Sequence, residues 1–160
     1  MRQRSARGLV GLLVAAVVAF SLVLLGCGAS ARPHHAAPPR PSQADRMKAV
    51  VRAWSANVDA ENNAAEARLF SLPASISLMK APYGCYCRTR AAVALLHTRL
   101  LCSGKVVSIE VRGRYATAAF RLGDRLTSRC DAPPGSVTGV RFTIVHGKIT
   151  VLKQVWFTPG

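Results

Sequence analysis

Residues 105–122 read KVVSIEVRGRYATAAFRL, and this stretch decides the fold class. Apolar residues alternate with polar ones before and after Gly113-Arg114. A period of two is typical of strands with one buried face, and a glycine between two such runs indicates a turn. We therefore predict a β-hairpin here, with these residues on its buried face: Val107, Ile109, Val111, Ala116, Ala118, Phe120 and Leu122.

A second hairpin follows towards the C-terminus. Pro133-Pro134-Gly135 marks a break, after which Val140, Phe142 and Ile144 again recur at every second position. His146-Gly147 then forms a tight turn into a last strand from Lys148 to Phe157. Together the two hairpins predict an antiparallel meander of four strands.

The residues before residue 105 show helical spacing instead. Ser42-Gln43-Ala44-Asp45 has the form of a capping box, and it precedes a predicted helix of about 14 residues with this apolar face: Met47, Val50, Val51, Trp54 and Val58. A short second helix is expected from Asn63 through Phe70, ended by Pro73, with a short strand at 75–79.

A third helix is expected from Arg90 to Leu101, capped by Thr89, with the stripe Val93, Leu96, His97 and Leu100. Three helices followed by a meander bury their apolar faces most economically as one layered domain. The predicted fold class is α+β, with a curved antiparallel sheet packed on three N-terminal helices.

The first 27 residues have the layout of an export signal. Met1 to Arg7 is cationic, Gly8 to Leu25 carries no charge, and Leu24-Leu25-Gly26-Cys27 resembles a lipobox, whose cysteine is lipidated and becomes residue one after cleavage. An uncleaved membrane anchor is the alternative. We expect a lipoprotein signal at 1–26, lipidated Cys27 and a Pro-rich tether at 27–44, and one domain at 45–160 on the outer face of the cell membrane.

The chain is strongly basic, with 22 Lys and Arg against 7 Asp and Glu and a formal charge of +15. Three of the cations lie in the signal, so the expected mature chain retains about +12. Export argues against nucleic acid as the partner. Anionic lipid headgroups, or acidic cell-wall polymers, surround a tethered envelope protein, and a merely solubilising surface is the alternative.

Four cysteines remain beside Cys27, and an oxidising compartment favours disulfides. Cys102 and Cys130 are the better pair, because each ends a predicted element and their bridge closes a loop of about 29 residues, worth about 3 to 4 kcal/mol. For Cys85 and Cys87 three options stay open: a strained local disulfide, free thiols, or exchange with the other pair. The spacing matches no structural zinc site, and we expect neither metal nor cofactor.

The order of elements and several motifs resemble the nuclear transport factor 2-like superfamily, which includes SnoaL-like cyclases and ketosteroid isomerases. The likeness runs from Asp45 to Trp156. It rests on these stretches: Val51-Arg52-Ala53-Trp54, Ala67-Arg68-Leu69-Phe70, Arg141-Phe142-Thr143-Ile144, Gly147-Lys148-Ile149-Thr150, Leu101-Cys102-Ser103-Gly104 and Arg129-Cys130-Asp131-Ala132-Pro133. The resemblance implies that the α+β domain is a cone-shaped roll with a pocket, which such proteins use for catalysis, for ligands or for protein contacts. The shortened first hairpin at Cys85-Tyr86-Cys87 departs from the family pattern.

Enzymes of this superfamily place an acid or base inside the cone. The pattern assigns every acid of the domain elsewhere: Asp45 to a cap, Glu66 to a helix start, Glu110 to a polar strand face, and Asp59, Glu61, Asp124 and Asp131 to turns or loops. We therefore expect no inward carboxylate and no catalytic residue.

Two hypotheses remain. The favoured one is a non-catalytic lipoprotein whose cone binds a small apolar ligand or docks an envelope protein. The other is a cyclase- or isomerase-type enzyme acting through His97, with Tyr115 as hydrogen-bond donor. The side chains expected to line the pocket are Trp54, His97, Phe120, Phe142 and Trp156. The sequence leaves the oligomeric state undetermined.

Overall fold

A computed structural model describes residues 40–78 and 84–156. The expectations for the signal, Cys27 and most of the tether lie outside these residues. The helices are α1 (Gln43–Asp59), α2 (Asn63–Ala67) and α3 (Arg90–Thr98). The strands are β1 (Phe70–Ser77), β2 (Gly84–Cys87), β3 (Cys102–Arg112), β4 (Tyr115–Asp124), β5 (Val137–Val145) and β6 (Lys148–Val155).

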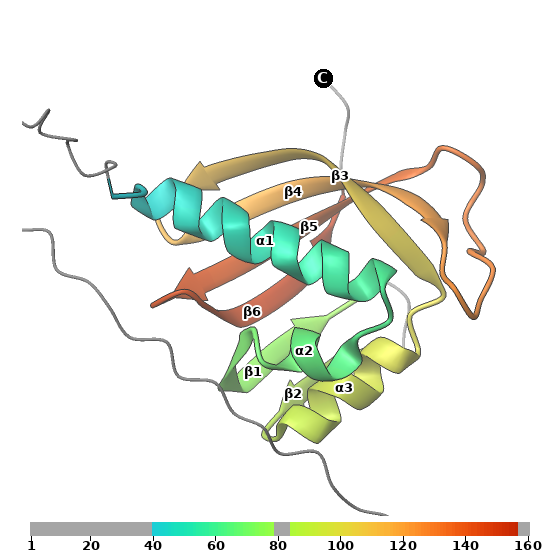
Figure 1. Cartoon of the computed structure of the whole chain (residues 1–160), viewed down its shortest axis with the longest axis horizontal. Coiled ribbons are helices and arrows are strands. Elements are labelled where there is room, and N and C mark those ends of the chain that lie inside the picture. Colours follow the sequence, from blue (N-terminus) through green and yellow to red (C-terminus); the bar gives the residue numbers. More distant parts are fainter. Residues whose placement is uncertain (1–39, 79–83, 157–160) are drawn as a thin grey trace, which may run out of the picture. The chain divides into compact units, whose positions relative to one another are not determined.

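The six strands form one curved sheet in the order β2-β1-β6-β5-β4-β3 (Figure 1). Strands β3 to β6 pair antiparallel with their chain neighbours, which confirms the predicted meander. The sheet is mixed rather than wholly antiparallel, because β1 runs parallel to β6. The α+β roll is otherwise as the sequence predicts.

Helix α1 crosses one face of the sheet (Figure 1). Its first turn has the predicted capping box, in which the Ser42 hydroxyl accepts from the Asp45 N–H and the Asp45 carboxylate accepts from Ser42. Its apolar face buries Met47, Val51, Trp54 and Val58 against the sheet. The core therefore lies between this helix and the inward positions of β4, β5 and β6, which include Phe120, Phe142 and Leu152.

The boundaries around the second helix differ from the prediction. Helix α2 ends at Ala67, and Phe70 begins β1 instead of continuing the helix. Pro73 lies inside that strand, in the irregular stretch between Phe70 and Ser75 where the pairing with β6 shifts. A proline is accommodated where a strand's ladder is interrupted, so it marks a bulge here and not a helix end.

A bulge also changes the predicted face of β3. Val106 pairs with Phe120 and Ser108 with Ala119, so Val107 is the extra residue and is 51% exposed. The bulge shifts the phase of the strand, because a one-residue insertion moves the following side chains to the other face. Val106 replaces Val107 on the core side, while Ile109 and Val111 pack against the core as predicted.

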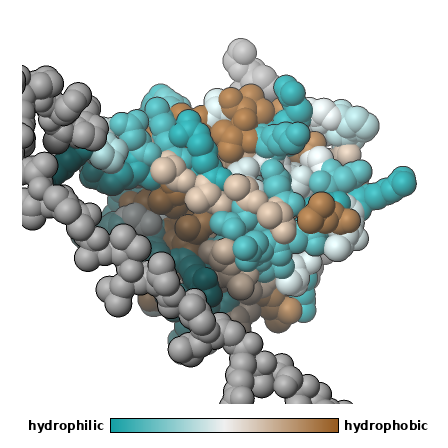
Figure 2. Space-filling view, in the orientation of Figure 1, coloured by the Kyte–Doolittle hydropathy of each residue, from teal (hydrophilic) through white to brown (hydrophobic). Residues whose placement is uncertain are grey.

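On the side shown in Figure 2, most of the described surface is hydrophilic, and hydrophobic residues form separate patches. No helix among the described residues is long and apolar enough to cross a membrane.

Candidate functional site

A cavity of about 220 Å³ opens between α1, the end of α3 and strands β3 to β6. Its wall is mostly apolar, and Trp54 and Phe120 line it as predicted. The other lining residues are Val58, Leu78, Arg99, Leu100, Leu101, Cys102, Ser103, Gly104, Leu122, Asp131, Ala132, Thr138, Val140 and Gln154. Several of these residues, such as Thr138 and Val140, occupy inward positions close to the loop between β4 and β5 (residues 125–136). The cavity therefore lies nearer this β4–β5 loop than the sequence indicated.

The polar groups of the cavity do not form an acid-base site. Arg99 and Asp131 are exposed and stand at the mouth. Inside, the Gln154 amide donates a 2.8 Å hydrogen bond to the Thr138 hydroxyl. The Trp54 indole N–H is buried without an acceptor among the described residues. The described wall therefore offers hydrogen-bonding groups but no histidine, tyrosine or buried carboxylate.

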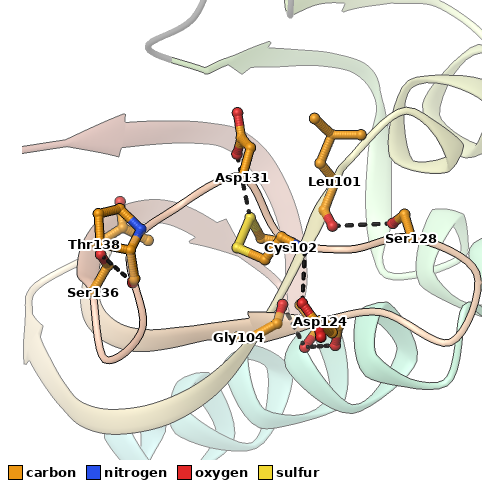
Figure 3. The surroundings of a disulfide bond; sticks show 12 residues. Leu101, Cys102, Gly104, Asp124, Ser128, Asp131, Ser136 and Thr138 are labelled. Carbon is orange, nitrogen blue, oxygen red and sulfur yellow. Dashed lines mark hydrogen bonds between the residues drawn. A yellow bond between two sulfur atoms is a disulfide. The ribbon is translucent and has the colours of Figure 1, made fainter.

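One rim of the cavity is fastened by a disulfide. Cys102 and Cys130 are bridged, with Cα atoms 4.4 Å apart, as the sequence predicts. Figure 3 shows Leu101 and Asp131 on the same side of Cys102, where both line the cavity. Asp131 Oδ1 lies 3.7 Å from Cys102 Sγ. This is a contact rather than a hydrogen bond or a metal site, because a disulfide sulfur has neither a proton to donate nor a free thiolate.

The rest of the β4–β5 loop is held by polar contacts. Cys130 N–H donates to Asp124 Oδ1 at 2.9 Å, and the Ser128 hydroxyl donates to the Leu101 carbonyl at 3.0 Å (Figure 3). Arg125 is buried and donates through Nη1 to the His97 carbonyl at 2.9 Å, at the C-terminal end of α3. A cation there is favoured by the helix dipole.

Glu61, in the turn between α1 and α2, also holds the β4–β5 loop in place. Its carboxylate accepts hydrogen bonds from the Thr127 N–H at 2.8 Å and the Thr127 hydroxyl at 2.9 Å, and Arg125 Nε lies 3.6 Å away. The Thr127 N–H is the main reason that the pKa of Glu61 is lowered, with smaller contributions from the Thr127 hydroxyl and Arg125. Glu61 has φ +53°, a conformation that non-glycine residues seldom adopt outside fixed turns.

Glu66 and His97 form a second polar group, called the buried pair below. His97 is 1% exposed and Glu66 0%, and His97 Nε2 lies 2.8 Å from Glu66 Oε1. His97 Nδ1 lies 2.9 Å from the Val93 carbonyl, which can only accept, so Nδ1 carries a proton. Each of these two buried side chains therefore has the other as its nearest polar side chain.

The position of Glu66 contradicts the expectation that no carboxylate points inward. Asn62 caps α2, and its side chain accepts from the Ala65 N–H, so the helix start does not need Glu66. The short helix instead turns Glu66 towards α3. Asp45 lies at a cap and Glu110 is exposed beside Arg112, as predicted. Asp59 and Asp124 instead end α1 and β4, where turns were expected.

The buried pair is separate from the cavity. His97 is buried, but neither it nor Glu66 belongs to the cavity wall. Trp54 contacts both regions, since it lines the cavity and its ring meets His97 edge-on at 6.2 Å between centroids. The inference that His97 lines the pocket is therefore wrong, because an apolar helix stripe places a side chain in the core without specifying which part.

Three other predicted site residues lie elsewhere. Phe142 is fully buried against Trp54 at 5.3 Å between centroids and does not line the cavity. Trp156 is 88% exposed just after β6, so it belongs neither to the core nor to the cavity. Tyr115 is 40% exposed at the start of β4, where Arg114 donates to its hydroxyl. Tyr115 pairs with Arg112 on the outer side of the sheet and cannot donate into the cavity.

Cys85 and Cys87 adopt the local disulfide among the options that the sequence left open. They belong to the edge strand β2, which pairs with β1, and Cys87 is buried.

No protein-family model matches the chain, and no curated protein matches it. Solved structures do. A protein of unknown function from Cytophaga hutchinsonii, described as nuclear transport factor 2-like, superposes with a TM-score of 0.52 at 11% identity, covering 68% of this chain and 88% of that one. A proposed polyketide cyclase from Sinorhizobium meliloti gives 0.52 at 15% identity, with 69% and 98% covered.

A third structure is a protein with a ketosteroid isomerase-like fold from Catenulispora acidiphila, in complex with trimethylamine. Its TM-score is 0.55 at 15% identity, covering 67% of this chain and 84% of that chain. At such identities the likeness concerns the fold. The chain therefore has the nuclear transport factor 2-like fold, and its function has to be argued from its own residues.

Proposed function

We propose that this protein is a membrane-anchored extracytoplasmic lipoprotein that binds a small apolar ligand in the cavity beside the Cys102–Cys130 bridge. The observation that carries the ligand proposal is an open apolar cavity that contains no buried acid or base among its described lining residues. Convergent apolar side chains with a few hydrogen-bonding groups are typical of binding sites.

The size of the cavity limits the ligand. An enclosed apolar cavity of about 150 Å³ holds benzene, whereas drug-sized ligands occupy about 300 Å³ or more. A cavity of about 220 Å³ suits one or two rings or a short acyl chain. Gln154 and Thr138 offer such a ligand polar contacts at the inner wall.

The proposed location rests on different observations. The uncharged stretch Gly8–Leu25 ends in Leu24-Leu25-Gly26-Cys27, which resembles a lipobox. The two disulfides support an oxidising compartment. Intact-mass analysis of the membrane fraction should find a chain that begins at acylated Cys27. A full-length chain with an unmodified thiol at Cys27 would contradict lipidation.

Ligand binding can be tested without the anchor, because residues 39–160 form one compact unit with their own core. A chain from residue 27 with Cys27→Ser is titrated with benzene and with naphthalene, and thermal stabilisation and ligand NMR signals are measured. Saturable binding should raise the melting temperature, because a ligand that binds only the folded state stabilises it.

A matched pair of variants locates the binding. Leu122→Trp enlarges a lining side chain into the cavity, while Leu126→Trp makes the same change at a residue that is 78% exposed and outside the wall. Only Leu122→Trp should abolish binding. Equal binding by both variants, or no saturable binding by the parent chain, would reject the cavity as a ligand site and favour protein docking instead.

The enzyme hypothesis keeps one supporting observation. Glu66 orients His97, and a carboxylate that fixes the tautomer is what makes a histidine an effective general base. A general base must reach the proton it abstracts, however, and both side chains are sealed from solvent and from the cavity. Turnover of a polyketide-like or steroid-like substrate that is lost in folded His97→Ala protein would reverse our preference.

A further inference from the structure

The face of the sheet opposite α1 carries a separate surface. Figure 1 shows α1 crossing one side of strands β3 to β6. Side chains alternate between the two faces of a strand, so residues next to the core positions point to the other side. We call this second side the outer face. Its cations are Lys105, Arg112, Arg121, Arg141 and Lys153, and all five are exposed.

Four of these cations are arranged in like-charged pairs. Lys105 of β3 stands directly opposite Arg121 of β4, and Arg141 of β5 stands directly opposite Lys153 of β6. Like charges in directly opposed positions repel each other and weaken a sheet. Two such pairs on one face are therefore not explained by the stability of the fold.

The outer face does not neutralise these charges itself. Its one carboxylate among the described residues is Glu110, which is bound to Arg112 at 2.6 Å. None of the four paired cations has an ion pair within the described parts of the chain. Ala119 and Gly139 lie opposite each other between the two cationic pairs, and both are small and buried, so neither adds a charge between the pairs.

We propose that the outer face binds the anionic headgroups of a phospholipid membrane. The cations are spread over four adjacent strands and form a two-dimensional array, which matches a surface of phosphates better than one linear chain. The proposal also draws on the proposed anchor at Cys27, since the roughly 15 residues from there to Ser42 keep the domain within about 50 Å of the lipid. Anionic membranes attract Lys and Arg near their surface.

The test uses the chain from residue 27 with Cys27→Ser, so that no acyl group contributes. Co-sedimentation is measured with vesicles of phosphatidylcholine alone and with vesicles in which about a quarter of the lipid is phosphatidylglycerol. Binding should require phosphatidylglycerol and fall as salt is raised, because the Debye length shrinks from about 10 Å at 0.1 M to about 3 Å at 1 M.

Two double variants that lose the same charge distinguish binding by the outer face from an effect of the net charge. Arg141→Gln/Lys153→Gln removes one opposed pair, and we expect a roughly 30-fold weaker partition into anionic vesicles. Arg52→Gln/Arg90→Gln removes two exposed cations from helices and should change the partition by much less. The outer-face variant should also be at least as stable as the parent chain, which shows that lost binding is not lost folding.

Equal losses from the two variants would overturn the proposal and reduce the effect to overall charge. Binding to isolated cell-wall polymer without binding to the vesicles would also overturn it, in favour of that polymer. Neither outcome bears on the cavity or on lipidation, because the chain tested carries no anchor and the substituted residues do not line the cavity.

Discussion

The buried pair and the cavity lie on two sides of Trp54. They differ in whether they contain an acid and a base, and in whether a small molecule can reach them. Glu66 and His97 place a carboxyl group and an imidazole 2.8 Å apart, but solvent does not reach them. The cavity is open and large enough for a small molecule, but its described wall lacks a buried acid or base. The groups that could react and the space for a reactant are therefore in different places.

This separation explains why one fold accommodates both hypotheses of function. In a working general-base site the base faces the cavity. Here Trp54, whose ring contacts His97, Phe120 and Phe142, occupies that position in the wall. The buried pair then serves to join α2 to α3, and the cavity serves binding.

The largest expected effect tests the buried pair. His97→Ala removes one partner of a fully buried carboxyl group, and Glu66 Oε2 already has no hydrogen-bond partner among the described residues. Breaking such a pair costs about 3–5 kcal/mol in unfolding free energy. Denaturant titration of the variant and the parent chain measures the difference.

A milder substitution sharpens the test. Glu66→Gln keeps the size and a hydrogen-bonding group while removing the charge, so it should cost less than His97→Ala. A loss below about 1 kcal/mol in His97→Ala would mean that the pair does not hold the helices together. His97 would then be a candidate functional residue instead of a structural one.

The second effect concerns the rim of the cavity. Cys102→Ser/Cys130→Ser opens a closed loop of about 29 residues and should lower the unfolding free energy by about 3 to 4 kcal/mol. It should also weaken benzene and naphthalene binding, because Asp131 and Ala132, which directly follow Cys130, line the cavity. Thermal denaturation and the ligand titration give the two values.

Cys85→Ser/Cys87→Ser is the matched control. These cysteines are two residues apart, so their bridge closes almost no loop, and neither lines the cavity. The control should leave probe binding unchanged. If both double variants weaken binding equally, the bridge acts through general stability rather than by holding the rim.

Much of the fold could be predicted because the deciding signals are local. The alternation in residues 105–122 and the Gly113 turn predicted the hairpin, and Ser42 with Asp45 predicted the start of the first helix. The errors arose where tertiary pairing overrides local pattern. Val107 leaves the core face because a bulge intervenes, and Phe70 joins a strand because β6 is available as a parallel partner.

The candidate site was harder to predict for a related reason. Glu66 follows an Asn cap in a short helix, and such an acid is usually at the surface. Only its packing against α3 shows that it faces His97. The cavity likewise depends on how residues distant in sequence meet, since Leu78, Leu101 and Gln154 belong to three separate parts of the chain. The only feature of the cavity rim that the sequence indicated clearly was the pairing of Cys102 with Cys130.

The smallest expected effect concerns Glu61, which fastens the cavity's loop through Thr127 and Arg125. Because the folded state lowers the pKa of Glu61, its contribution to stability is complete above its ordinary value of 4.5 and is lost as pH falls through the lower, folded pKa. Glu61→Gln should therefore be less stable than the parent at neutral pH, and the gap should narrow below about pH 4.5. The gap should be modest, because the carboxylate is partly solvated.

Unfolding free energies of the Glu61→Gln variant and the parent chain between neutral and acidic pH measure this gap, with Glu110→Gln as the surface control. Naphthalene binding by the parent chain should weaken over the same range, since Asp131 and Ala132 follow Thr127 into the cavity wall. A gap that stays constant with pH would show that Glu61 contributes only through its shape, and the cavity would then keep its rim in acid.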